Sequence, residues 1–341
     1  MKTFRYIIYL FAVVICFASC EKVVEFDEDE TQTLVVMNAC AQADSSFSAK
    51  LTYSRFFLDG SSFRPINDAQ VILNVNGTDY NATTSGQKGE YSVLYKPQPG
   101  DSLTLRALIP GRDEVSASAK IPSRLTISDI STSHIYDSAN SYYDPSWYNV
   151  SDNIIHFKFK LHDRADERNY YRIHVYYRDT LIKDEYYYNY NGSISDTVTD
   201  TLYRQQSSCE FKIIDPAIIN ASTNLGDIFD EGVETGSYEG SNLLFTDERI
   251  NGHNHEIHLA INIPYLYCNY LRMLHSYVEV RVESISRDYY LYLATKEKQM
   301  NGNELTAIFS EPVRIHCNVK NGLGILGASS ITCVPARVII K

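Results

Sequence analysis

The feature that most constrains the fold is a series of short alternating segments separated by turn residues. Four such segments lie between residues 70 and 122, and Asn-Gly, Pro-Gly or single glycines separate them. Alternation puts every second side chain on one face of a strand, and strands about ten residues apart favour two packed sheets. Residues 31–122 are therefore predicted to form an immunoglobulin-like β-sandwich. The alternating apolar positions are Val71, Leu73, Val75, Tyr91, Val93, Tyr95, Leu103, Leu105, Ala107, Ala117, Ala119 and Ile121.

The remaining residues, 123–341, carry further strand patterns and are predicted to form a larger β-sandwich domain with loop insertions. Asn191-Gly192 is typical of a hairpin turn, and the polar, aromatic stretch 136–152 is predicted to be a long loop. A helix is expected over 286–302, where Ser286 can cap the first turn, and a short one after Pro216. The predicted fold class is mainly β, with one or two short helices.

The stretch "CNVKNGLGILG", residues 317–327, raises the question of a phosphate-binding loop. Such a loop leads from a strand into a helix, with a lysine after the glycines. Here Lys320 precedes the glycines, and strand patterns flank them at 313–319 and 330–340. We therefore expect these glycines to supply positive φ angles and close backbone approach in a connection between late strands.

The N-terminus has the features of an export signal. A basic start precedes an apolar run over residues 6–17, which is too short to span a bilayer. Ala18-Ser19-Cys20 follows and is similar to the bacterial lipobox, in which the cysteine is acylated and becomes the new N-terminus. Residues 1–19 are predicted to be a lipoprotein signal peptide, and Cys20 the lipidation site. A secretory signal followed by an accidental cysteine is the alternative.

Residues 20–30 are predicted to form an acidic tether. Five of the six residues from Glu25 to Glu30 are acidic, and like charges keep a chain extended. The tract also resembles the signal that sends some lipoproteins of Gram-negative gut bacteria to the cell surface; a solvated linker is the alternative. Removal of the signal takes away two basic residues and changes the formal net charge from −11 to −13. Nucleic-acid binding is not expected of so acidic a chain.

Seven cysteines are present. One lies in the signal and one in the lipobox, which leaves an odd number in an oxidising compartment. The two cysteines that flank the glycine-rich stretch could pair, but sequence spacing does not define connectivity. The remaining five are Cys40, Cys209, Cys268, Cys317 and Cys333.

Tyrosine is unusually frequent, with 27 Tyr against 14 Phe and 1 Trp. Clustered tyrosines could form an aromatic platform for sugars or peptides, because these rings bury a large area at low entropy cost. Alternatively, the rings pack against strand neighbours and every second one is exposed. The possible ligand surface comprises Tyr142, Tyr143, Trp147, Tyr148, Tyr186, Tyr188 and Tyr190.

The stretch "HNHEIH", residues 253–258, resembles a metal-binding sequence but lacks the HExxH spacing of a helical zinc site. An apolar alternation continues after it, so we expect a strand. On a strand, His253 and His255 share one face, and Glu256 and His258 share the other. Solvated or cross-strand-paired histidines are expected rather than a metal site. No catalytic residue and no cofactor is predicted.

The order of these features resembles one bacterial family. A lipobox and an acidic tether precede "NDAQVILNVNG" and "GEY", and later come "FTDERING" (245–252), "SISRDYYLYL" and "NVKNGLGILG" (318–327). This order resembles the lipoproteins of domain-of-unknown-function family 4249. The resemblance implies an outer-membrane lipoprotein, often encoded beside a TonB-dependent transporter, with no established catalytic residues.

These observations favour a non-enzymatic, cell-envelope lipoprotein that is lipid-anchored in the outer membrane; which face of the membrane it occupies, the cell surface included, stays open. It would act as an accessory or binding subunit of a TonB-dependent transporter. Two alternatives remain open: a hydrolase of surface polymers, with the histidine-rich strand or loop acids as catalysts, and a structural or adhesion module.

Overall fold

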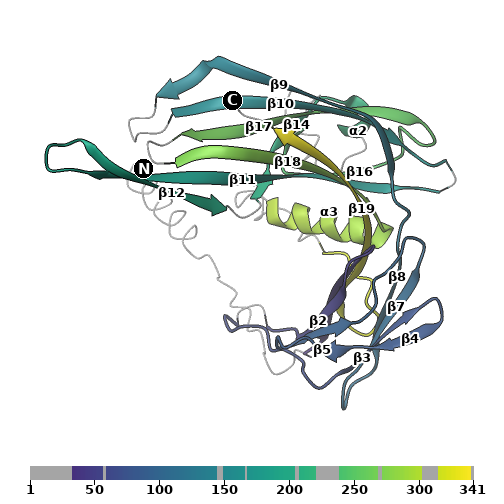
Figure 1. The fold of residues 1–341 in the computed structure, drawn as a ribbon. Helices are drawn as coiled ribbons and strands as arrows, with labels where there is room; N and C mark the ends of the chain where they lie inside the picture. The colour runs from purple at the N-terminus through teal and green to yellow at the C-terminus, as the bar shows by residue number, and fades with distance from the viewer. Residues whose placement is uncertain are drawn as a thin grey trace, which may run out of the picture.

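The computed structural model describes residues 33–56, 59–143, 149–165, 167–203, 207–219, 238–267, 271–301 and 314–338. The predicted signal peptide, the acidic tether with Cys20, and Cys268 lie outside these residues. These described residues are mainly β and form two β-sandwiches and two short helices, which confirms the predicted fold class (Figure 1).

The smaller sandwich packs a four-stranded sheet, in the order β4-β3-β7-β8, against β1, β2, β6 and β5. Its core includes most of the alternating apolar positions that the sequence predicts, and Leu73, Leu105 and Ala107 have no exposed surface. The strands are β1 (Val35–Gln42), β2 (Phe47–Tyr53), β3 (Gln70–Val75), β4 (Thr78–Asn81), β5 (Thr83–Thr84), β6 (Glu90–Val93), β7 (Ser102–Leu108) and β8 (Val115–Lys120).

The larger sandwich packs a five-stranded sheet, in the order β15-β14-β17-β10-β9, against a second sheet built mainly from β11, β18 and β19. Phe157, Phe159 and Phe211 lie at the centre of its core. The strands are β9 (Thr126–Tyr143), β10 (Asn149–His162), β11 (Tyr170–Tyr188), β12 (Ile194–Tyr203), β13 (Ser207–Cys209), β14 (Phe211–Ile213), β15 (Tyr238–Gly240), β16 (Asn242–Thr246), β17 (Asn254–Tyr267), β18 (Leu271–Ile285) and β19 (Leu323–Val338).

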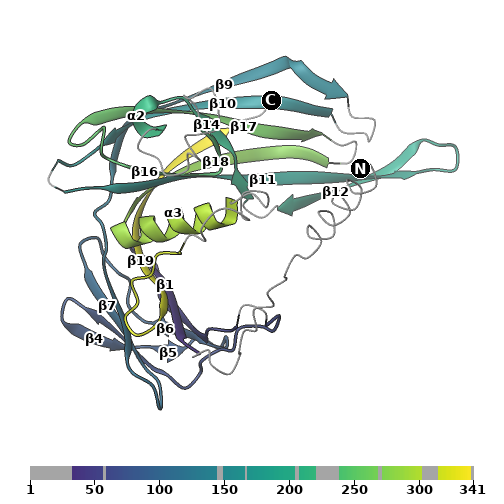
Figure 2. The same ribbon diagram turned by 180° about the vertical axis from the view of Figure 1, so that it is seen from behind.

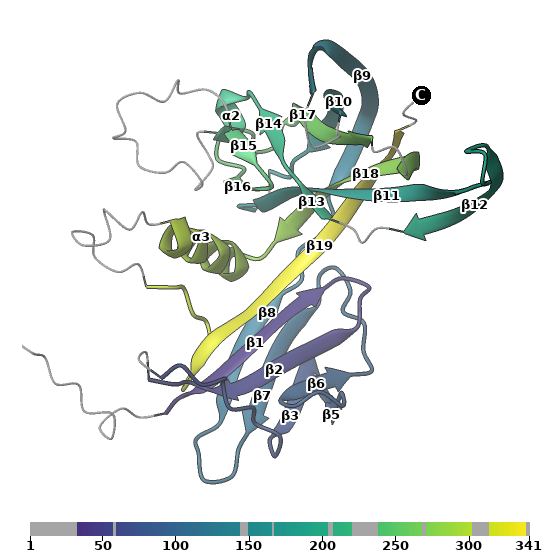
Figure 3. The same cartoon turned by 90° about the vertical axis from the view of Figure 1, so that its left-hand side faces the viewer.

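Strand β19 joins the two sandwiches, because one continuous ten-stranded sheet runs through both. The first half of β19 pairs in parallel with β1, from Leu323 opposite Val36 to Ser329 opposite Gln42. Its second half pairs antiparallel with β18, and Figure 3 shows it crossing from one sandwich to the other. The core of the smaller sandwich therefore includes Leu326 and Ala328, which lie far beyond the predicted range 31–122.

Helix α3 (Arg287–Asn301) covers the face of the ten-stranded sheet that is turned away from the core of the larger sandwich (Figure 2). Tyr290 and Ala294 are buried there against Leu244 and Ile285. The helix begins as predicted, since the Ser286 hydroxyl accepts a hydrogen bond from the helix's first turn. The short helix α2 (Pro216–Ile219) is also confirmed. Neither helix in the described part of the chain is long and apolar enough to cross a bilayer.

Two predictions about local structure are wrong. The stretch 136–152 is not a long loop: β9 runs to Tyr143 and β10 begins at Asn149, paired in one hairpin. Its polar residues suit β9 because this strand is the edge of its sheet. The stretch 313–319 is not a strand in its described part, which has no regular structure from Arg314 to Val319.

Candidate functional site

The β11–β12 hairpin extends beyond the sheet that carries it. Strand β11 is paired with β18 only as far as Lys183, opposite the first residue of β18. From there to Tyr188 its pairing is with β12, which is the edge of the sheet. We call this two-stranded extension, residues 184–199, the arm. Figure 1 shows its turn projecting past the ends of the other strands.

The turn of the arm is closed by local hydrogen bonds. The Asn189 N–H donates to the Ser193 carbonyl at 2.7 Å, and the Gly192 N–H donates to the Asn189 carbonyl at 2.8 Å. Gly192 has φ +79°, a conformation that glycine adopts without strain. The predicted hairpin turn at Asn191-Gly192 is therefore confirmed.

Large apolar side chains on the arm face solvent. The exposed fraction is 111% for Tyr190, 55% for Ile194, 52% for Tyr187 and 47% for Val198. A two-stranded ribbon is marginally stable alone and gains little from side chains left in water. Clustered exposed apolar residues on a soluble domain mark interaction surfaces. The arm is therefore the candidate functional site of the described chain.

The arm contains three residues of the predicted ligand surface, Tyr186, Tyr188 and Tyr190. The backbone of Tyr142 and Tyr143 ends β9, which belongs to the other sheet of the larger sandwich. Of these five, the structure describes the side chain of Tyr190 alone, and Trp147 and Tyr148 lie outside the described residues. An aromatic platform thus stays a prediction.

Two exposed apolar residues of the arm, Ile194 and Val198, are not part of the ligand surface that the sequence predicts. They lie on β12, four residues apart in an otherwise polar stretch. Period-two alternation places positions 194 and 198 on the same face of a strand. Their pattern could have predicted an apolar strip, but only the structure shows that these two side chains are exposed, on the edge strand of the described sheet.

The histidine-rich stretch forms the start of β17, as predicted, and one of its histidines, His258, is paired with a histidine on the neighbouring strand. His258 Nε2 lies 2.9 Å from Nδ1 of His156 on β10, and His255 Nε2 lies 2.6 Å from Asp215 Oδ2. Burial and the neighbouring His156 lower the pKa of His258. Among the described residues, no three His, Cys, Asp or Glu side chains are placed to hold a metal ion.

A cluster of buried charges lies on the face of the ten-stranded sheet that α3 covers. Glu283 on β18 contacts two residues of β11: Oε1 lies 2.8 Å from His174 Nε2, and Oε2 lies 3.7 Å from Arg172 Nη1. Glu283 and His174 are almost fully buried. Glu297 of α3 lies near Arg172, and burial raises its pKa. Arg172 and Glu283 form an ion pair that joins β11 to β18, whereas His174 Nε2 and Glu297 Oε2 are buried without a well-oriented hydrogen bond among the described residues.

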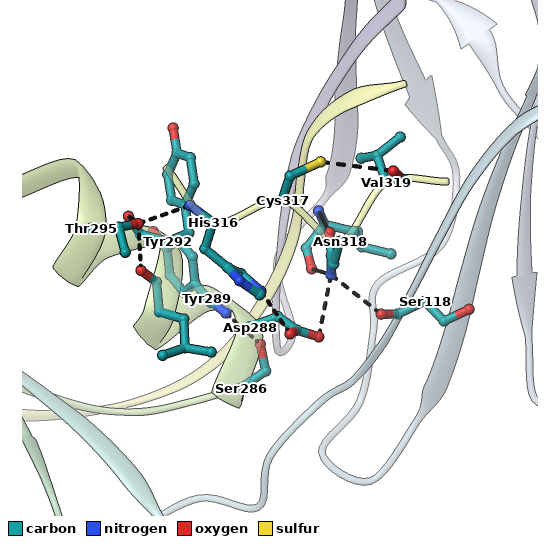
Figure 4. A network of polar contacts seen from close by, with 12 residues as sticks. Ser118, Ser286, Asp288, Tyr289, Tyr292, Thr295, His316, Cys317, Asn318 and Val319 are labelled. Carbon is teal, nitrogen blue, oxygen red and sulfur yellow. Dashed lines mark hydrogen bonds and ion pairs between the residues drawn. The ribbon is translucent and has the colours of Figure 1, made fainter. Parts of the chain in front are cut away.

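A second polar network connects α3 to the stretch before β19 (Figure 4). Asp288 in the first turn of α3 accepts a contact from His316 Nε2 at 2.9 Å. Asn318 bonds the backbone of Leu326 in both directions, through Oδ1 at 2.9 Å and Nδ2 at 3.0 Å. These bonds explain why 314–319 is not a strand: its polar side chains bind α3 and β19 instead of a strand partner.

The stretch 245–252 has a comparable structural role. Asp247 is buried, and its Oδ2 accepts the Asn169 N–H at 2.7 Å. Gly252 has φ +70° and lies against Ala165, while its N–H donates to Asp163 at 2.7 Å. Burial raises the pKa of Asp163. These residues form a closed turn next to the core of the larger sandwich.

Cys317 and Cys333 are free thiols in the described part of the chain, so they are not paired with each other. Cys209 is buried in the core of the larger sandwich, and burial raises its pKa to about 11.

Comparison with known families agrees with this arrangement of motifs. A family model described as "Domain of unknown function (DUF4249)" matches residues 21–333. The chain belongs to this family; of the two stretches on which the resemblance rests, 245–252 forms a turn, and 318–327 leads into the first half of β19. A comparison with curated proteins found no match.

Proposed function

We propose that this protein is a non-enzymatic lipoprotein of the outer membrane that serves as an accessory subunit of a TonB-dependent transporter, with the arm as its docking element. The observation that carries the proposal is the projection of the arm beyond the sheet, with Tyr187, Tyr190, Ile194 and Val198 exposed. Burial of such side chains against a partner would supply the stabilisation that a free ribbon lacks.

The sequence before the described residues supports the membrane anchor. Ala18-Ser19-Cys20 is similar to a lipobox, and a tri-acylated or di-acylated cysteine binds membranes firmly where one acyl chain does not. From Cys20 to Thr33 the chain can reach at most roughly 45 Å. A lipid anchor of that length would hold the smaller sandwich near the bilayer.

Fractionation of cells that carry Cys20→Ala tests the anchor. We expect the variant to move from the membrane fraction to the soluble fraction, while the unmodified protein stays with the membrane. Equal recovery of both proteins in the membrane fraction would rule the lipid anchor out.

Affinity purification from detergent-solubilised membranes tests the docking role. The tagged protein is expected to bring down a β-barrel transporter, and the double variant Tyr190→Ser/Ile194→Ser is expected to lose it. Leu94→Ser is the matched control, because Leu94 is 105% exposed on the smaller sandwich. A transporter recovered equally with all three proteins would exclude the arm as the docking element. Its absence from all three would argue against the accessory role.

A further inference from the structure

Three arginines gather where the tether enters the smaller sandwich. The Arg64 and Arg112 guanidiniums both lie over the ring of Tyr53, with Cζ 4.2 Å and 5.0 Å from the ring centroid. Arg55 lies over the ring of Phe63 at 4.6 Å. We call these five residues the arginine patch. Stacking on aromatic faces holds guanidiniums in place and leaves their N–H donors free for an anion.

None of the three arginines forms an ion pair with a carboxylate in the part of the chain that the structure describes. Their polar contacts go to backbone instead: Arg112 donates to the Thr33 carbonyl, and Arg55 donates to the Ser61 carbonyl. The pKa of Asp59 is lowered, first by hydrogen bonds from Ser61 and then by the positive charge of Arg55. All three arginines are exposed.

Arginines elsewhere on this surface are paired. Arg106 binds Asp79 at 2.8 Å, and Arg124 contacts Asp44. In a chain with a formal net charge of −11, an unpaired arginine cluster is a local positive region in a negative field. Such a region attracts anions strongly.

The tether, residues 20–30, ends close to this patch in the sequence, because Thr33 contacts Arg112. Leu34 is tied to Ser54, with its N–H donating to the Ser54 hydroxyl at 2.9 Å and its carbonyl accepting the Ser54 N–H at 2.8 Å. Tyr53, the ring under two of the arginines, is paired with Val35 at the start of β1. Glu30 precedes Thr33 by three residues, so its carboxylate is within roughly 10 Å of the patch at full extension.

We propose that the acidic tether, through the carboxylates of residues 25–30, docks on the arginine patch of its own chain. Five carboxylates meet three unpaired guanidiniums, whose fork of donors matches a carboxylate. Covalent connection gives the tether a high effective concentration at the patch. An anionic lipid headgroup would have to displace these acids and approach a strongly negative segment. The tether is therefore the occupant that charge and reach favour.

Docking of the tether needs no lipid, so the inference is independent of the proposed function. If Cys20 is lipidated, the docked tether shortens the link between the anchor and the smaller sandwich. The patch would then face the bilayer, and the sandwich would sit in a defined orientation instead of swinging on a free linker.

Limited proteolysis of the mature chain, made soluble by Cys20→Ala, tests the docking. Thermolysin cleaves before large apolar residues and can cut the tether before Phe26. We expect the double variant Arg64→Gln/Arg112→Gln to be cut there faster than the parent by roughly 2- to 30-fold, because each exposed ion pair contributes a modest amount. Addition of 0.5 M salt should accelerate cleavage of the parent in the same way. The control is Arg287→Gln, an exposed arginine at the start of α3 that should change nothing.

A second variant keeps the test valid if the arginine substitutions disturb folding. Replacement of the five tether acids by Gln or Asn should accelerate the same cut, and adding the arginine substitutions to it should bring no further change. Equal rates in the parent and both variants would overturn the proposal. So would arginine-dependent sedimentation of the parent with phosphatidylglycerol vesicles at unchanged tether cleavage, since lipid would then be the occupant.

Discussion

The contact between β1 and β19 should depend on one glycine. Gly324 has φ +114°, and a Cβ at this position would lie 2.2 Å from the Met37 carbonyl oxygen and 2.8 Å from Asn38 Oδ1. Gly324→Ala therefore combines an unfavourable backbone conformation with a clash against the neighbouring strand. The Asn38 side chain could move aside, but the contact with the Met37 carbonyl cannot be relieved in this way, because that atom is backbone.

The expected loss of stability can be worked from these two contributions. A non-glycine residue in this region of φ costs about 1–3 kcal/mol, and overpacking of a tight contact costs about 1–3 kcal/mol. Gly324→Ala should thus lower the free energy of unfolding by about 2–6 kcal/mol. For a protein of this size, such a loss of stability corresponds to a fall of roughly 5–15 °C in the midpoint of thermal unfolding.

The matched control is Gly100→Ala. Gly100 has φ +93°, but a Cβ there would meet nothing within 4 Å. Gly100→Ala should therefore lose only the free energy that the positive φ angle costs. Thermal or urea unfolding, followed by tyrosine fluorescence, should give it a clearly higher unfolding midpoint than Gly324→Ala. Equal midpoints for the two variants would refute the close-approach argument and leave the φ angle as the whole effect.

Three further outcomes follow from buried groups. Glu283→Gln should cost about 2–4 kcal/mol in urea unfolding, because it leaves the mostly buried guanidinium of Arg172 without its counter-charge; Glu279→Gln, on the same strand but partly exposed, should cost under about 1 kcal/mol, and similar losses would contradict the reasoning. Asn318→Ala should cost about 2–3 kcal/mol by removing two backbone bonds of Leu326; an unchanged unfolding midpoint would show those bonds to be dispensable. The pKa of Cys209 is raised from 9.0 to about 11, so the folded state holds this proton more tightly than the unfolded state. Stability should therefore fall as the pH rises from 9 to 11, and Cys209→Ala should reduce that slope; identical slopes would place the effect elsewhere.

Local patterns predicted most of the fold. Period-two alternation identified the strands of the smaller sandwich, because a strand with one buried face needs apolar residues at every second position. Turn and cap chemistry is equally local: Gly192 closes the arm, and Ser286 begins α3. The predicted loop over 136–152 failed because an edge strand tolerates polar residues that an interior strand would not.

The sequence by itself determined what depends on neighbours along the chain: the alternating strands of the smaller sandwich and the caps, while the export signal and the acidic tether stay predictions from the same kind of local pattern. Tertiary structure decided what depends on distant partners. The parallel pairing of β1 with β19 joins residues 36 and 323, and no local pattern encodes such a partner. The arm became a surface because β12 is the edge strand of its sheet in the part of the chain that the structure describes. The arginine patch formed because Arg55, Arg64 and Arg112, scattered in the sequence, share two aromatic rings. The sequence gives the chemistry of each side chain, whereas its exposure and its spatial neighbours are set only when the sheets pack together.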